Sequence, residues 1–223
     1  MPDSTIISFG IDAEEAVRPM KSAVVQLESG SLAGEWNADH TVCAFKGIPY
    51  ARPPVGPLRW RPPQPLQRWS GTRRATAFGP RCVQPNRPPH AVGYFGPEPE
   101  SEDCLYLNLW TASPAPGEKR PVMLWLHGGA FLVGSGSLPI FDGAALAKRG
   151  AVVVTINYRL GRLGFLAHPQ LSAEQPLRVS GNYGLLDQIA ALRWVEANIA
   201  AFGGDPGQVT IFGRLPARQA SAR

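Results

Sequence analysis

The sequence lacks long apolar runs, a basic leader and clustered lysines, and each absence excludes something. No stretch approaches the ~18 apolar residues that cross a bilayer, so we expect no membrane segment. The first twenty residues contain no basic start followed by an apolar block, so no signal peptide is expected. Cytoplasmic location is therefore the expectation, with secretion as the alternative.

Positive charge is present but scattered. The net charge of +5 comes from 18 arginines and 4 lysines against 17 acidic residues, and no helix or run gathers the basic ones. Nucleic-acid binding needs a basic stripe, so it is not expected. With 223 residues and 44% hydrophobic content, the chain is long enough for one sizeable core, which favours one domain or part of one.

The most informative stretch is Pro121 to Ser137, PVMLWLHGGAFLVGSGS. Its five apolar residues, Val122 to Leu126, predict a strand buried on both faces. The glycines that follow allow backbone N–H groups to point at one spot, as the stabilisation of a negative oxygen requires. Gly128, Gly129 and Ala130 are therefore a candidate oxyanion hole, and a Gly-rich turn is the alternative interpretation.

Strand patterns precede this stretch and strand–helix patterns follow it. Short strands over 24–27, 31–36 and 41–45 predict an antiparallel β start, and a Pro-rich segment from Pro53 to Pro65 excludes helix. Further strands are expected over 104–110, 122–126, 151–156 and 209–212, with helices over 141–149 and 181–202. Buried strands alternating with helices indicate a mainly parallel sheet with flanking helices, so the fold class is α/β.

Seven blocks in the same order resemble the type-B carboxylesterase family of α/β-hydrolases. They are Phe45-Lys46-Gly47-Ile48-Pro49-Tyr50-Ala51, Pro53-Pro54-Val55-Gly56, Ser101 to Asn108 (SEDCLYLN), His127-Gly128-Gly129-Ala130-Phe131, Asn157-Tyr158-Arg159-Leu160-Gly161, Gly181 to Gln188 (GNYGLLDQ) and Phe202-Gly203-Gly204-Asp205-Pro206. The resemblance covers most of this chain but only the N-terminal part of a typical member. It implies the first part of an α/β-hydrolase fold, which ends at the nucleophile elbow.

The resemblance also implies residue roles. Arg59 with Glu102, and Arg159 with Asp187, correspond to two structural ion pairs of the family. Cys82 and Cys104 match a pair that closes a surface loop by a disulfide, whereas a reducing cytoplasm would keep both as thiols; both alternatives stay open. The family hydrolyses small-molecule carboxylic esters through a serine nucleophile and needs no metal or cofactor.

Neither the adjacent carboxylates nor the histidines of this sequence are expected to form a catalytic site. Adjacent Glu102 and Asp103 face opposite sides of a strand, so they cannot act together on one bond. Among the histidines, His127 belongs to the oxyanion loop, and His40, His90 and His168 lie in turns, which favours solvated side chains over a catalytic base.

The elbow itself is missing from the sequence. The family's Gly-x-Ser-x-Gly should follow the strand at Gly213, but Arg214-Leu215-Pro216-Ala217 stands there. Read one base out of frame, codons CGT, CTG, CCG and GCN would give Ser-Ala-Gly. We therefore expect 1–19 to be disordered, 20–213 to be the N-terminal portion of a carboxylesterase domain, and 214–223 to be an out-of-frame tail.

Without serine, acid and histidine, the chain is expected to be inactive. A non-catalytic, cholinesterase-like adhesion protein or the product of a decayed gene is the alternative function.

Overall fold

The computed structural model of the chain describes residues 22–85 and 98–214. The segment 1–19, His90 and the tail beyond Arg214 lie outside the described residues, so the expectations for them are not tested.

Most of the structure is one mixed sheet with short helices against it. Its strands are β1 (Ser22–Leu27), β2 (Gly30–Trp36), β3 (Cys43–Pro49), β4 (Thr72–Arg74), β7 (Tyr106–Thr111), β8 (Arg120–Leu126), β9 (Val152–Ile156) and β10 (Gly204–Gly213), while β5 (Arg81–Cys82) and β6 (Glu100–Ser101) form a separate pair. The helices are α1 (Ala144–Lys148), α2 (Gly161–Phe165), α3 (Pro169–Ala173) and α4 (Tyr183–Asn198).

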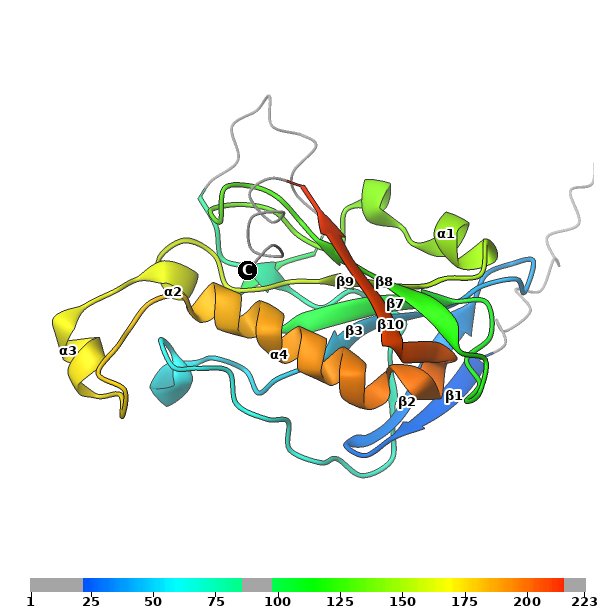
Figure 1. The fold of residues 1–223 in the computed structure, drawn as a ribbon, viewed down its shortest axis with the longest axis horizontal. Coiled ribbons are helices and arrows are strands. Elements are labelled where there is room, and N and C mark those ends of the chain that lie inside the picture. The colour runs from blue at the N-terminus through cyan, green and yellow to red at the C-terminus, as the bar shows by residue number, and fades with distance from the viewer. Residues whose placement is uncertain (1–21, 86–97, 215–223) are drawn as a thin grey trace, which may run out of the picture.

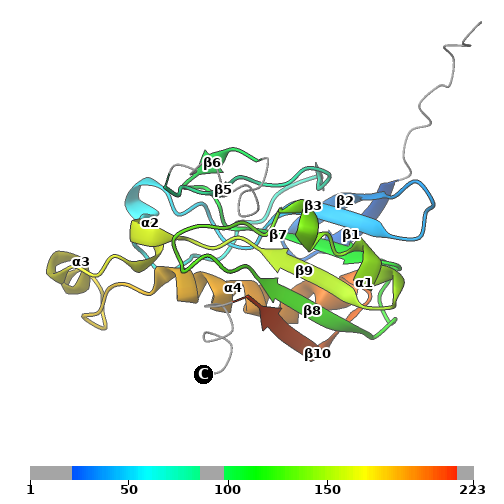
Figure 2. The ribbon, with the colours of Figure 1, turned by 90° about the horizontal axis from the view of Figure 1, so that it is seen from above.

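The strands lie in the order β1-β2-β3-β7-β9-β8-β10, which can be followed across Figure 2, and β4 pairs with β2. Neighbours from β1 to β9 in this order run antiparallel, whereas β9, β8 and β10 are parallel. The antiparallel start and the α/β class are as predicted. The parallel part is smaller than expected because β7, inserted beside β9, runs antiparallel to both of its neighbours.

Helices cover both faces of the sheet, as Figure 1 shows for α1 and α4. Alternation along β3 explains this arrangement: Phe45 meets Phe202, just after α4, with ring centroids 5.0 Å apart, whereas neighbouring Ala44 packs with Trp110 and Ala147 of α1. The main core lies on the α4 side.

The parallel strands β8 and β9 were both expected to be buried on both faces, and this holds for β9 but not for β8. All five residues of β9 are buried, as expected for a strand covered on both faces. In β8, Val122, Leu124 and Leu126 are buried while Met123 and Trp125 are only partly covered, so the expectation of burial on both faces is wrong there. The less covered face of Trp125 is bounded by Phe141 and Phe212, with ring centroids 4.8 and 4.9 Å away.

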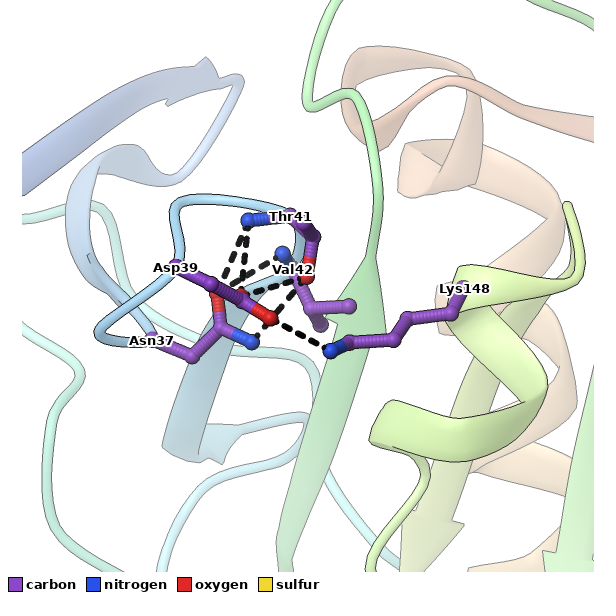
Figure 3. A network of polar contacts seen from close by, with 5 residues as sticks. All are labelled: Asn37, Asp39, Thr41, Val42 and Lys148. Atoms are coloured by element: carbon purple, nitrogen blue, oxygen red, sulfur yellow. Dashed lines mark hydrogen bonds and ion pairs between the residues drawn. The ribbon is translucent and has the colours of Figure 1, made fainter.

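A polar network ties the turn between β2 and β3 to α1 (Figure 3). Asn37 Oδ1 accepts hydrogen bonds from the amides of Thr41 and Val42, and Asp39 accepts from Thr41. Lys148 Nζ lies 2.6 Å from Asp39 Oδ2. The network is exposed, so it orders the turn more than it stabilises the fold.

Candidate oxyanion site

The candidate site is the loop that follows β8 at the carboxyl end of the parallel strands. Its backbone turns sharply: φ is +125° at Gly129, +55° at Ala130 and +60° at Phe131. A Cβ on Gly129 would lie 1.9 Å from the carbonyl oxygen of Val133, so only glycine fits there. The Gly129 carbonyl accepts from the amides of Leu132 and Val133 at 2.9 and 3.1 Å, which closes the turn.

The amides at the start of the loop have no acceptor among residues 22–85 and 98–214. Neither Gly128, Gly129 nor Ala130 donates a backbone hydrogen bond to any of these residues. Gly128 is buried, Gly129 is partly exposed and Ala130 is exposed. Adjacent unpaired N–H groups with access to solvent can bind an oxyanion, so Gly129 and Ala130 are better placed than Gly128 to do so.

The end of β10 lies beside this loop. Gly213 pairs in parallel register with Leu126, and the amide of Arg214 lies 3.4 Å from the Leu126 carbonyl oxygen. Arg214 and His127 therefore follow the paired ends of two neighbouring strands. Functional groups in open α/β sheets gather at this edge.

His127 is a packing group in this site rather than a base. It is 1% exposed, stacks on Tyr158 with ring centroids 4.4 Å apart, and places Nδ1 3.0 Å from the Gly128 carbonyl oxygen. Burial lowers the pKa of His127 to about 4, so the ring is neutral at physiological pH. The Tyr158 hydroxyl donates to the His127 carbonyl at 2.9 Å, which fixes the start of the loop to the segment after β9.

Buried polar side chains hold the second half of the loop. The Gln84 amide accepts from the Gly134 N–H at 2.9 Å and donates to the Gly134 carbonyl at 3.1 Å. Asn157 Oδ1 accepts from the Gly136 amide at 2.8 Å, and the Ser135 hydroxyl donates to Glu98. No sequence pattern marks Gln84 or Glu98 as part of this site, because their partners lie far away along the chain.

The remaining predicted residues lie as follows. Arg59 Nε is 2.6 Å from Glu102 Oε2 on the surface. Arg159 contacts Asp187 through Nη2 at 2.7 Å and Nε at 2.8 Å, and both side chains are almost fully buried. Burial opposes the charge of Arg159, but the hydrogen bonds to Asp187 prevail and raise the pKa of Arg159 above its usual value.

All three cysteines are buried thiols in this structure. Contact with Cys82 and burial together raise the pKa of the Cys104 thiol well above its usual value. The two predicted partners therefore lie close together, while the disulfide itself stays a prediction.

The other described histidines lie away from the loop. His40 is in the β2–β3 turn and His168 caps α3 by accepting from the Gln170 amide. Among the described residues, no group of three or more His, Cys, Asp or Glu side chains could hold a metal ion. None of the described helices is long and apolar enough to cross a membrane.

Comparison with known proteins gives a consistent picture. Residues 21–215 match the Carboxylesterase family. The chain is 53% identical over 186 residues to a fumonisin B1 esterase from Sphingopyxis macrogoltabida, which covers 83% of this chain and 33% of that protein. It is 46% identical over 195 residues to the para-nitrobenzyl esterase of Bacillus subtilis, which covers 87% of this chain and 38% of that protein.

Solved structures agree with these relatives. A PNB esterase structure matches with a TM-score of 0.80 at 44% identity over 89% of this chain and 40% of that one. The Geobacillus stearothermophilus carboxylesterase EST55 matches with a TM-score of 0.75 at 53% identity over 85% of this chain and 37% of that one. The chain thus spans little more than a third of these relatives. With its sheet, its Gly-rich loop and nearly all of its described residues matched, the chain belongs to the carboxylesterase family.

Proposed function

We propose that this chain supplies the oxyanion-binding part of a serine carboxylesterase that acts on small-molecule carboxylic esters. The observation that carries the proposal is the pair of amides of Gly129 and Ala130 beside the end of β10, which donate to no described residue and belong to a partly exposed and an exposed residue. Such donors stabilise the negative oxygen that develops when a nucleophile attacks an ester carbonyl. The esterase names of the relatives support the same class of reaction.

In the proposed mechanism, a serine just after the strand β10 attacks the ester carbonyl carbon. A histidine takes the serine proton and passes it to the departing alcohol, while Gly129 and Ala130 donate hydrogen bonds to the tetrahedral oxyanion. Water then attacks the acyl-enzyme, the histidine takes the proton of the water and passes it to the serine oxygen, and the carboxylic acid is released. An acidic side chain orients the histidine. No described histidine of this chain suits that role, because His127 is buried and neutral and the other two lie elsewhere.

The 223-residue sequence has no Gly-x-Ser-x-Gly, and we propose that residues 214–223 are read out of frame. The position of Gly213 beside Leu126 supports this, because a serine two residues past Gly213 would emerge next to the unpaired amides. Ser221 is the only serine after Gly213. The chain in its present frame is then catalytically silent.

Hydrolysis of 4-nitrophenyl butyrate tests the proposal. We expect no turnover by the 223-residue chain above the rate of its Ser221→Ala variant, which controls for trace host esterases. The protein translated in the shifted frame should hydrolyse the ester and lose about 100-fold or more on Gly129→Ala, since the new methyl group displaces the donor loop. Turnover by the 223-residue chain that disappears in Ser221→Ala would contradict the proposal.

A further inference from the structure

A largely apolar cavity adjoins the candidate oxyanion loop. Its volume is about 910 Å³, and its walls come from three segments, 83–85, 130–132 and 160–167. Ala130 itself is part of the wall. If an ester carbonyl binds at the candidate oxyanion amides, the substituent on that carbonyl can therefore lie in this cavity.

The first turn of α2 is fixed directly on the loop. The Gly161 amide donates to the Phe131 carbonyl at 2.7 Å, and the Phe131 and Phe165 rings lie 4.8 Å apart. Trp60 Nε1 donates to the carbonyl of Arg162 at 2.9 Å, so a second, distant segment also holds this turn. The backbone of Arg162 is therefore held in place relative to the loop by one backbone hydrogen bond, one ring contact and one indole hydrogen bond.

Among the residues that the structure describes, Arg162 is the one charged residue that lines the cavity. Its side chain is exposed, and it makes no salt bridge or side-chain hydrogen bond with the residues that the structure describes. Gln84, the other polar residue with a long side chain in the wall, already uses its amide on Gly134 and on the Cys82 carbonyl. The described part of the wall thus combines an apolar lining with one cation that has no described ionic partner.

We propose that Arg162 is a specificity residue that makes the site favour esters whose apolar part carries a carboxylate, and disfavour cationic esters. The inference rests on the proposed function, because it assumes that the ester carbonyl sits at Gly129 and Ala130. An exposed guanidinium attracts a carboxylate and repels an ammonium group, with the effect weakened by solvent and salt. The expected preference is therefore about two- to fivefold for each change of charge.

Binding of three matched esters to the 223-residue chain tests this proposal. The ligands are 4-nitrophenyl hydrogen glutarate, 4-nitrophenyl valerate and the 4-nitrophenyl ester of 5-(trimethylammonio)pentanoic acid, measured by calorimetry at low salt. We expect the anionic ester to bind about two- to fivefold tighter than the neutral one and the cationic ester to bind weakest. Arg162→Gln should equalise the three, and Arg162→Glu should reverse their order.

Two further variants make the outcomes distinguishable. Arg149→Gln, at an exposed arginine after α1, is the matched control and should leave the order unchanged. Leu132→Ser, at a cavity residue that is 52% exposed, should weaken all three esters without altering their order. If the three bind equally and Leu132→Ser weakens them all, the cavity is an ester site and the role of Arg162 is wrong. If none binds, or Leu132→Ser has no effect, the ester site proposed for this loop loses its support as well.

Discussion

At the scale of single residues, the candidate loop depends on side chains that are buried without charge. His127 packs on Tyr158 in a position where an imidazolium would have almost no contact with solvent, and among the described residues it has no ion pair. The loop was predicted from its glycines, but the neutral state of His127 could not be, because burial of a side chain depends on elements distant in sequence.

The stability of the fold should therefore fall with acidification through His127. Its pKa is about 4 in the folded chain and 6.5 when unperturbed, so the unfolded state binds more protons between these values. The stability that the neutral His127 ring gives the fold is fully present above pH 6.5. It is lost as the pH falls to about 4, which lowers the free energy of unfolding by up to about 3 kcal/mol. Urea unfolding at several pH values should show a shallower dependence for His127→Gln than for the parent chain.

His40→Gln, at an exposed histidine in the β2–β3 turn, is the control and should leave that dependence unchanged. Identical pH dependences for His127→Gln and the parent chain would refute the assignment of a neutral, buried ring.

Ala130 holds a left-handed backbone conformation that costs an alanine about 1 kcal/mol. Ala130→Gly should thus stabilise the chain by about 0.5 kcal/mol, since glycine reaches this conformation without steric cost but loses more entropy. Ala145→Gly, in α1, should instead destabilise it by up to about 1 kcal/mol. Thermal unfolding of both variants checks the signs, and destabilisation by Ala130→Gly would show that its backbone is not strained.

At the scale of elements, the sequence predicts what periodicity and apolar runs can reveal. The strands β8 and β9 were expected from apolar runs, and the helix expected over 181–202 is α4 followed by a short 3₁₀ turn that ends at Gly203. The helix α2 was missed because five residues that include Gly161 and Gly164 carry no periodic signal. Contacts with distant segments hold it: the Gly161 amide donates to the Phe131 carbonyl at 2.7 Å, and Trp60 Nε1 donates to the Arg162 carbonyl at 2.9 Å.

The loop after Gly129 should lose its order when Gln84 is replaced. Gln84→Met keeps the volume but removes the hydrogen bonds to Gly134 and leaves buried backbone groups unpaired, at a cost of about 2 kcal/mol. Hydrogen exchange at the Gly134 amide should become about tenfold faster or more. Gln67→Met, at an exposed position, is the control. Unchanged hydrogen exchange at Gly134 in Gln84→Met would contradict the role of the Gln84 hydrogen bonds in ordering the loop.

The buried pair between Arg159, in the loop after β9, and Asp187 of α4 should stabilise the fold far more than the surface pair. Asp187→Asn leaves the guanidinium of Arg159 buried without a counter-charge, which should cost about 3 to 5 kcal/mol of unfolding free energy. Glu102→Gln removes the partner of the partly exposed Arg59 and should cost less than about 1 kcal/mol. Urea unfolding of both variants checks this ranking, and equal losses would mean that burial does not set the strength of these pairs.

At the scale of the whole molecule, two parallel strands bring the candidate oxyanion amides and the position after Gly213 to one edge of the sheet. The order of motifs in the sequence was enough to predict the fold and the loop. The contacts of Gln84, Glu98 and Gly161 with that loop could not be predicted, because each joins segments that are brought together only by the folded sheet and the short helix α2.

The DNA sequence from the codon for Phe212 through several hundred downstream bases tests the central claim most directly. The account predicts that a shifted frame reads Ser-Ala-Gly one residue beyond Gly213, completing Gly-x-Ser-x-Gly, and stays open through an Asp or Glu and a His. The contradictory result is confirmation of the present frame together with early stop codons in the other two. The unpaired amides of Gly129 and Ala130 would then have no nucleophile to serve.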